Sequence, residues 1–171
     1  MDSREKKLIA VVDTLADDIV DFTMRLVAEP STLGNEAGAL AVMTTELNRL
    51  GFAVSRVGLD SELLTRHPGY APVPWSLAER YNVLGSFAPA KTGGRSALFN
   101  GHLDVVHPGN RSSWDHDPFL PRVVDGWLLG RGAGDMKAGV AAMTYAVHAV
   151  ARAGFGLAAP VTVEAVIEEE C

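Results

Sequence analysis

An apolar run near the middle of the chain ends on two polar side chains that are able to do chemistry. Residues 96–101 lead into the sequence Gly101-His102-Leu103-Asp104. If the run is a buried strand, its side chains alternate between two faces, so His102 and Asp104 point the same way at the strand's end. A metal-binding histidine usually donates its second ring N–H to a neighbouring acceptor, which makes the pair a candidate metal site. On this pattern alone, a turn in which Asp104 caps the next element is the simpler interpretation.

Two later stretches strengthen the metal-site interpretation. One is rich in glycine around Asp135, and the other is an apolar run that ends on three glutamates at positions 168–170. Together with His102 they offer the imidazole and carboxylate ligands that suit hard or borderline divalent cations. The chain has a single cysteine, Cys171, and so lacks the thiolate cluster of a structural zinc site. The sequence therefore favours a catalytic metal over a structural one.

Length and charge limit the other possibilities. A chain of 171 residues that is 47% hydrophobic can bury one core, which predicts a single domain over residues 1–171 or the greater part of one. A net charge of −6 argues against nucleic acid as a partner. No apolar run approaches the ~20 residues that span a bilayer, and the charged N-terminus has no signal-peptide core. We therefore expect a cytoplasmic protein that does not bind membranes.

Apolar periodicity predicts helices and strands along the whole chain. The predicted helices are residues 3–28, 35–50 and 136–152, and the predicted strands are 52–57, 81–87, 96–101, 120–124, 127–130 and 161–167. This order is typical of an α/β fold. We expect strands 81–87 and 96–101 to pair as an antiparallel hairpin that brings His102 to a sheet edge, and an Asp125-Gly126 turn to join a second hairpin.

The glycine-rich stretch around Asp135 also invites a nucleotide-binding interpretation. Lys137 follows Met136 rather than glycine, and no serine or threonine follows it, so neither common phosphate-binding pattern fits. Glycines here would instead let the backbone approach a ligand and present Asp135 just before a helix. A nucleotide-binding α/β protein remains an alternative that a nucleotide titration would test.

The remaining histidines have simpler explanations than metal binding. His107 and His116 fall in a loop rich in aromatic and acidic residues, where a surface loop with side-chain turns accounts for them. His67 lies in a segment over residues 58–79 that is rich in proline and glycine and predicts a solvated surface excursion. His148 lies one step off the apolar stripe of its helix, which is typical of a partly buried structural histidine.

Taken together, these motifs resemble the N-terminal part of the catalytic domain in peptidase family M20, which includes acetylornithine deacetylase, succinyl-diaminopimelate desuccinylase, aminoacylase and carboxypeptidase G. The motifs are Gly101-His102-Leu103-Asp104, Trp114 with Asp117-Pro118-Phe119, Gly130-Arg131-Gly132 with Gly134-Asp135-Met136-Lys137, and Glu169-Glu170. The resemblance implies a mixed β-sheet flanked by helices, as in a dinuclear zinc exopeptidase-like catalytic domain. By the same resemblance this domain is incomplete, and its inserted lid and dimerisation domain is absent.

The resemblance also implies roles for individual residues. His102, Asp135 and Glu170 would bind two divalent ions, most naturally zinc, with cobalt or manganese as alternatives, and Asp135 would bridge them. Asp104 would support His102, and Glu169 would be the general base. In an uninterrupted strand Glu169 and Glu170 point to opposite faces, so the strand must end or bend there. If the register slips by one residue, Glu168 takes the role of the base.

The activity implied by this resemblance is hydrolysis of a C–N amide bond in an N-acylated amino acid or small peptide by the complete protein, possibly paired as a homodimer. Two further ligands would follow Cys171, so we expect residues 1–171 alone to be an inactive fragment. The resemblance also implies a cis peptide between Asp135 and Met136. A non-catalytic metal-binding or scaffold fragment is the main alternative, and it would tolerate Glu169→Gln.

Overall fold

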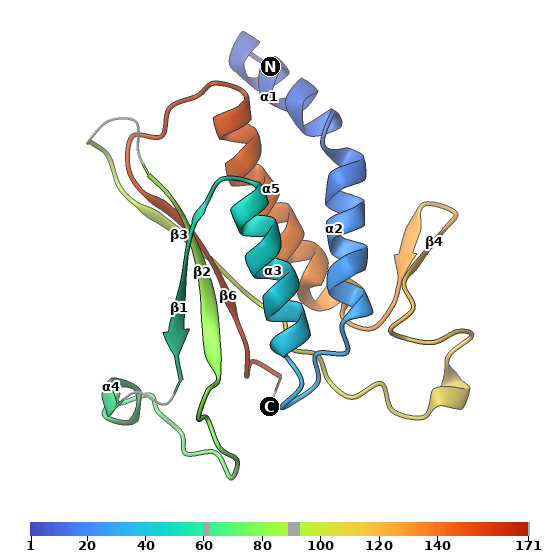
Figure 1. Ribbon diagram of the computed structural model, residues 1–171. Coiled ribbons are helices and arrows are strands. Elements are labelled where there is room, and N and C mark those ends of the chain that lie inside the picture. Colours follow the sequence, from blue (N-terminus) through green and yellow to red (C-terminus); the bar gives the residue numbers. More distant parts are fainter. Residues whose placement is uncertain (60–61, 89–92, 171) are drawn as a thin grey trace.

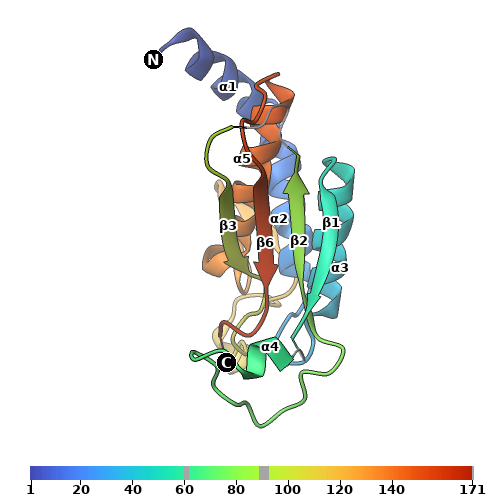
Figure 2. The ribbon, with the colours of Figure 1, turned by 90° about the vertical axis from the view of Figure 1, so that its left-hand side faces the viewer.

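Four strands of the chain form one mixed sheet, and its long helices lie on one side of that sheet (Figure 1). The computed structural model describes residues 1–59, 62–88 and 93–170. The strands of the sheet are β1 Ala53–Gly58, β2 Tyr81–Phe87, β3 Ala97–His102 and β6 Val161–Val166. Their spatial order is β1-β2-β6-β3, with β2 antiparallel to β1 and β6, and β3 parallel to β6 (Figure 2). The α/β class and the mixed sheet are as predicted.

The helices are α1 Ser3–Asp13, α2 Ala16–Ala28, α3 Ala37–Arg49, α4 Glu62–Thr65 and α5 Ala138–Arg152. The long helices follow the predicted pattern with one break, whereas the four-residue α4 lies in residues 58–79, where an irregular surface excursion was predicted. The single helix predicted over residues 3–28 is two helices, which meet at Thr14 and Leu15, where the Thr14 hydroxyl donates to the Val11 carbonyl at 2.7 Å and Leu15 is buried in the core. The described part of the chain contains no helix long and apolar enough to span a membrane.

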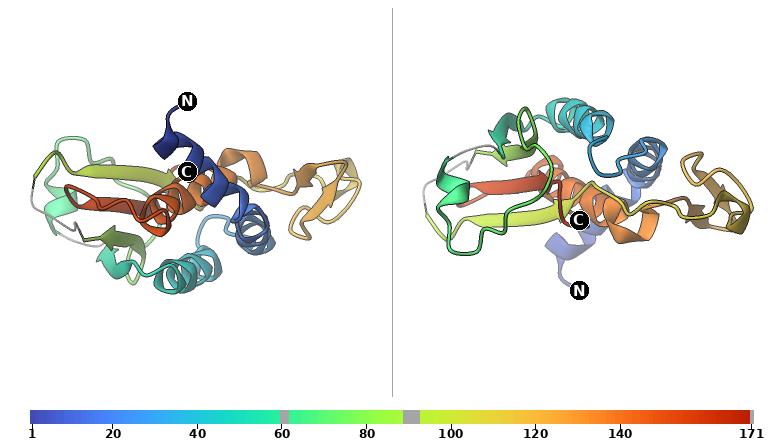
Figure 3. Two further views of the ribbon diagram at one scale, coloured as in Figure 1. Left: turned by 90° about the horizontal axis from the view of Figure 1, so that it is seen from above. Right: turned by 90° about the horizontal axis from the view of Figure 1, so that it is seen from below.

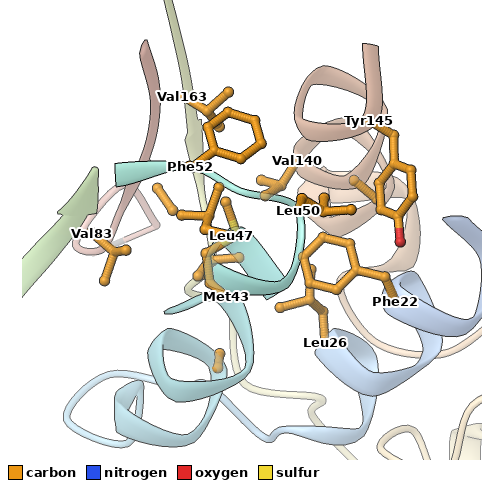
Figure 4. Packing of buried hydrophobic residues seen from close by; sticks show 14 of the residues in the cluster. Phe22, Leu26, Met43, Leu47, Leu50, Phe52, Val83, Val140, Tyr145 and Val163 are labelled. Carbon is orange, nitrogen blue, oxygen red and sulfur yellow. The ribbon is translucent and has the colours of Figure 1, made fainter. Parts of the chain in front are cut away.

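The core lies between the inner face of the sheet and helices α2, α3 and α5 (Figure 4). On the sheet side, Val83 of β2 and Val163 of β6 are fully buried. The buried side chains that the helices contribute include Phe22, Leu26, Met43, Leu47, Val140 and Tyr145. Full burial of each such side chain stabilises the fold by about 1.5–3 kcal/mol, so this cluster holds the helices on the sheet.

The predicted hairpin between residues 81–87 and 96–101 is wrong. Strand β6 lies between β2 and β3 and pairs with both. The reason is burial, since Val163 and Ala165 of β6 are both 0% exposed and take the central position of the sheet, which is hydrogen-bonded on both sides. Residues 89–92, between the two segments of the predicted hairpin, lie outside the described residues. His102 still reaches an edge strand, as expected, but through the parallel pairing of β3 with β6.

Strand β3 is also less buried than expected. Its first four residues are exposed, with Leu98 at 58% and Phe99 at 43%, and only Gly101 and His102 are buried. An edge strand has a neighbour on one side alone, and α5 covers only its end. The strand therefore delivers its buried histidine at the point where the helix begins.

The second predicted hairpin is confirmed. Strands β4 Arg122–Val124 and β5 Trp127–Leu129 pair antiparallel. Asp125 and Gly126 both have positive φ, at 49° and 82°, which is the geometry of the favoured two-residue hairpin turn. The hairpin lies on the opposite side of α2 and α5 from the main sheet (Figure 3). It leads directly into the glycine-rich stretch that carries Asp135.

Candidate metal centre

His102 lies at the carboxyl end of β3, and its imidazole is 4% exposed. Its Nδ1 is 3.0 Å from the backbone carbonyl oxygen of Asp104, which suits donation of an Nδ1–H to that oxygen. The opposite nitrogen, Nε2, is 3.1 Å from Asp135 Oδ1 and 3.7 Å from Glu169 Oε2. In the neutral tautomer that Nδ1–H donation selects, the Nε2 lone pair therefore faces two carboxylates.

The electrostatics of His102 reflect this crowding of negative charge. Burial disfavours the imidazolium, but the Asp104 carbonyl and the carboxylates of Asp135 and Glu169 outweigh burial and raise the pKa of His102 above its ordinary value. An added positive charge at Nε2 is thus stabilised by its surroundings, whether that charge comes from a proton or from a metal ion.

Asp104 is almost completely buried, at 1% exposed. Its Oδ2 accepts a hydrogen bond of 2.8 Å from the backbone N–H of Glu170. Its Oδ1 lies 3.6 Å from His102 Nδ1 and receives no hydrogen bond from the described residues. The support that Asp104 gives His102 thus comes mainly through its backbone carbonyl, while its carboxylate holds the segment that carries Glu170.

Asp135 lies in the turn Ala133–Lys137 that precedes α5, and its own backbone is extended there, with a φ of −131° and a ψ of 102°. Gly132 starts this turn with a φ of 78°, and a Cβ there would lie 2.3 Å from a methyl group of Val105, so only glycine fits. The Asp135–Met136 peptide is cis, as expected. The Asp135 side chain is 80% exposed and faces His102.

Lys137 anchors this turn from inside the protein. Its side chain is fully buried, and Nζ donates to the carbonyls of Leu26 and Glu29 at 2.8 and 2.9 Å. These carbonyls lie at the end of α2, where helix geometry leaves acceptors without partners. Burial lowers the pKa of Lys137 to about 8, against the opposing attraction of Glu29 and Asp104. In the sequence, Lys137 was notable only as the last residue of the Gly134-Asp135-Met136-Lys137 motif and for its misfit to a phosphate-binding loop.

The chain bends after β6, as predicted. Glu168 has a positive φ of 74°. Its carboxylate accepts a hydrogen bond of 2.8 Å from Trp75 Nε1 and forms an ion pair with Arg80. Glu169 is 60% exposed beside His102, and Glu170 approaches Asp135. The bend therefore brings the side chains of both Glu169 and Glu170 close to His102.

Three of the predicted ligands meet at that place. One ligand atom from each of His102, Asp135 and Glu170 lies within 4.8 Å of the other two. Among the described residues, no lysine or arginine forms an ion pair with Asp135, Glu169 or Glu170. One imidazole nitrogen with carboxylate oxygens is a donor set that zinc accepts. The geometry, the missing counter-charge and the donor types all fit a divalent cation.

The other histidines do not join this cluster. His107 and His67 are exposed, and His148 Nδ1 lies 3.3 Å from the Leu50 carbonyl, away from the cluster, in the structural position expected for it. His116 packs edge-on against Trp114, with ring centroids 6.4 Å apart. Sequence reasoning missed Trp75 and Arg80, which lie at the end of the surface excursion and carried no pattern linking them to the glutamates.

The sequence is similar to known hydrolases. Residues 98–171 match the profile of peptidase family M20/M25/M40. Succinyl-diaminopimelate desuccinylase from Rhodopseudomonas palustris (strain BisB18) is 39% identical over 132 residues, which cover 77% of this chain and 30% of that protein. The enzyme of the same name from Paracoccus denitrificans (strain Pd 1222) is 38% identical over 129 residues, covering 75% and 28%. The chain thus spans about 30% of the length of these relatives.

Solved structures share the fold. Human carnosine dipeptidase 1 superposes with a TM-score of 0.70 and 27% identity, over 96% of this chain and 34% of that one. The di-peptidase Dug1p from Saccharomyces cerevisiae gives a TM-score of 0.73 at 20% identity, over 94% and 34%. The metallo-carboxypeptidase Sso-CP2 of the M20 family, from Sulfolobus solfataricus, gives 0.66 at 16% identity, over 86% and 30%.

Proposed function

Because the chain belongs to peptidase family M20/M25/M40, we propose that the complete protein is a dinuclear metal-dependent amidohydrolase that cleaves the C–N amide bond of an N-acylated amino acid or small peptide. The observation that carries the proposal is the convergence of His102, Asp135 and Glu170 within 4.8 Å. The names of the relatives, desuccinylase and dipeptidase, both describe hydrolysis of an amide bond. Residues 1–171 would form the N-terminal part of the catalytic domain.

His102, Asp135 and Glu170 would hold the metal, with Asp135 as the shared ligand between two ions. Zinc suits the nitrogen and oxygen donors, and cobalt or manganese would be tolerated by the same set. When bound, the ions would polarise the scissile carbonyl and lower the pKa of the attacking water. The remaining ligands would come from the rest of the protein, so residues 1–171 alone would bind metal weakly and hydrolyse nothing measurable.

Glu169 would act as the general base. No described group donates a hydrogen bond to its carboxylate, and its Oε2 lies 3.7 Å from His102 Nε2, beside the proposed metal ligands. A base must reach the proton of the attacking water without being occupied as a ligand. Glu169 is therefore free to take that proton and pass it to the leaving amine, whereas Glu168 is already engaged by Trp75 and Arg80.

Asp104 would position two of these groups at once. Its carbonyl accepts from His102 and fixes the ring with Nε2 toward the site, and its carboxylate fixes the backbone of Glu170. Removal of such a supporting residue usually lowers metal affinity by about 10- to 100-fold.

A hollow of about 470 Å³ lies next to the cluster and offers room for substrate. Glu170 forms one part of its lining, and Trp75, Val105, Val106 and His107 form others. A substrate whose amide reaches Glu170 would place an adjoining group against this mostly apolar wall. A homodimer and a cytoplasmic location stay predictions from the sequence.

The test is to purify the complete protein, remove its metal with a chelator, and reload it with zinc, cobalt or manganese. The substrates are N-acetyl amino acids, N-succinyl-diaminopimelate and dipeptides, with the released amine measured. We expect hydrolysis of at least one substrate, its loss on chelation and its return with metal. No hydrolysis with any of the metals, or activity that survives chelation, would contradict the proposal.

A further inference from the structure

Glu168 is held more tightly than either of the glutamates that follow it. Its side chain is 14% exposed, and its two carboxylate oxygens face different partners. Trp75 Nε1–H donates to Oε2 at 2.8 Å, while the Arg80 guanidinium forms an ion pair with Oε1. Both partners come from the end of the surface excursion, about ninety residues earlier in the chain. Such a clamp on a residue next to the site needs an explanation.

Arg80 joins a second buried acid to this clamp. The guanidinium, 13% exposed, also forms an ion pair with Glu36, which is 4% exposed and precedes α3. Glu36 in turn accepts a hydrogen bond of 2.8 Å from the Gly34 N–H. Arg80 therefore lies between two carboxylates from opposite ends of the chain, and it fixes the end of β6 relative to α3.

The clamp coincides with a backbone conformation that side chains other than glycine rarely adopt. Glu168 has a φ of 74°, in the left-handed region that favours glycine. On either side the backbone is held as well, by Asn82 accepting from the Ile167 N–H at 3.2 Å and by Asp104 accepting from the Glu170 N–H at 2.8 Å. Glu169 lies between these fixed points without a hydrogen bond of its own from the described residues.

We propose that Arg80 and Trp75 are positioning residues, which hold Glu168 in its left-handed turn and thereby present Glu169 to the site as the base. The inference rests on the proposed function. It assigns Glu168 a fixed, non-catalytic place, and it separates two tasks: Asp104 holds Glu170 for the metal, while the clamp on Glu168 holds Glu169 for proton transfer.

The first experiment compares variants of the complete, zinc-loaded protein. Arg80→Met and Glu168→Ala remove the two halves of the clamp, and Arg66→Met is the matched control, since its pair with Glu62 is exposed on the same excursion. We expect kcat to fall at least ~10-fold for both clamp variants, because an error of ~1 Å in placing a catalytic group costs up to about 10²-fold. KM should stay within ~3-fold of wild type, zinc content should not change, and the control should match wild type.

Two further substitutions separate the side chain from the backbone. Glu168→Gly adopts a positive φ freely but has no carboxylate, whereas Glu168→Gln keeps one acceptor oxygen, enough for Trp75 or Arg80 but not for both. We expect Glu168→Gln to retain more of kcat than Glu168→Ala, and Glu168→Gly to lose as much as Glu168→Ala. Wild-type kcat in Glu168→Gly would show that the turn alone suffices, and it would overturn the role of the clamp.

The decisive step repeats Glu168→Ala in a Glu169→Gln background. If the clamp acts through Glu169, it has nothing left to position, so the second substitution should change the residual rate by less than ~2-fold. An equal loss in both backgrounds, or a loss of zinc, would mean that the clamp serves the fold or the metal site, and the inference would fail. If Arg80→Met does not fold because Glu36 is left buried without its partner, Glu168→Ala keeps that pair and carries the test.

A measurement independent of activity keeps the two proposals distinguishable. With 5-fluorotryptophan incorporated, the ¹⁹F resonance of Trp75 is assigned by its absence in Trp75→Phe. We expect that resonance to shift in Glu168→Ala and Arg80→Met and to stay in place in Arg66→Met. If the wild type hydrolyses nothing, the proposed function fails, but an unshifted line in both clamp variants would overturn the clamp by itself.

Discussion

Two sites in the molecule that carry carboxylates differ in how the negative charge is compensated. Glu46 in α3 is 1% exposed and has donors from three side chains: Arg25 at 2.7 Å, Arg49 at 2.6 Å and Tyr145 at 2.6 Å. The acids around His102 are closer to the surface, with Asp135 80% and Glu169 60% exposed. Within the described residues they have no lysine or arginine in an ion pair, and the only cationic partner near them is the imidazole.

This difference in compensation indicates which of the two sites is structural. A buried carboxylate is costly unless donors and a counter-charge accompany it, and Glu46 has both within the chain. Burial alone raises the pKa of Glu46, but its hydrogen bonds with Arg49, Tyr145 and Arg25 outweigh burial and lower it. The acids around His102 gather at one point without such partners. A divalent cation fits this place as their counter-charge, as expected for the proposed metal site.

The largest effect should come from the base. Glu169→Gln in the complete protein should lower kcat by at least ~10²-fold, because general base catalysis contributes about that much or more, while zinc content stays as in wild type. Steady-state kinetics with metal analysis measures both. Glu168→Gln is the control, and a larger loss there than in Glu169→Gln would shift the register of the glutamates by one. Unchanged turnover in Glu169→Gln would favour a non-catalytic metal-binding protein.

Loss of a proposed ligand should weaken metal binding. His102→Ala should weaken zinc binding by at least ~10-fold, the lower end of what even supporting residues contribute. In wild type, zinc at 100 times its dissociation constant should stabilise the folded state by about 2.7 kcal/mol, because the ion binds only that state. Thermal unfolding with and without zinc measures this. His148→Ala is the matched control, and an equal loss of zinc stabilisation there would contradict the assignment of His102.

The structural cluster should respond in stability and not in activity. Glu46→Gln should reduce the free energy of unfolding by about 1–2 kcal/mol, because charge-assisted hydrogen bonds become neutral and both arginine partners are partly exposed to solvent. Urea unfolding measures the change, and kcat per folded molecule should stay at the wild-type value. A lower kcat with unchanged stability would mean that the two clusters are not separate.

The smallest effect is the pH dependence of that stability difference. The folded-state pKa of Glu46 is lowered, so its contribution is complete above the unfolded-state value of about 4.3 and is lost as the pH falls through the folded value. The stability gap between wild type and Glu46→Gln should therefore be constant from pH 7 to about 5 and shrink at lower pH. A gap that widened on acidification would reverse the sign of the argument.

The sequence predicted local structure well where one segment decides it. The Asp125-Gly126 turn and the end of the helix predicted over residues 35–50, which Gly51 follows with a φ of 86°, depend on residues within a few positions. Strand order was wrong for β2 and β3, because the position of β6 between them depends on which apolar strand the helices bury. Because the two strands are neighbours in sequence, they were predicted to form a hairpin. In the structure each of them pairs instead with β6, which lies far along the chain.

The site divides in the same way. Local patterns indicated His102, Asp135 and the run of three glutamates, and the family resemblance singled out Glu170 among them; the structure brings His102, Asp135 and Glu170 together. Arg80 and Trp75 could not be predicted, because their partner Glu168 is about ninety residues away and their segment has no regular pattern. Local patterns thus indicate which residues carry chemistry, while packing decides which residues hold them.

The most direct test of the metal site is anomalous scattering at the zinc edge from crystals of the complete protein grown with zinc. We expect two peaks, with His102 Nε2, Asp135 and Glu170 at bonding distances of about 2 Å and Asp135 contacting both ions. Glu169 should lie beside the peaks without binding either ion. Peaks elsewhere in the molecule, or none near Asp135, would contradict the account.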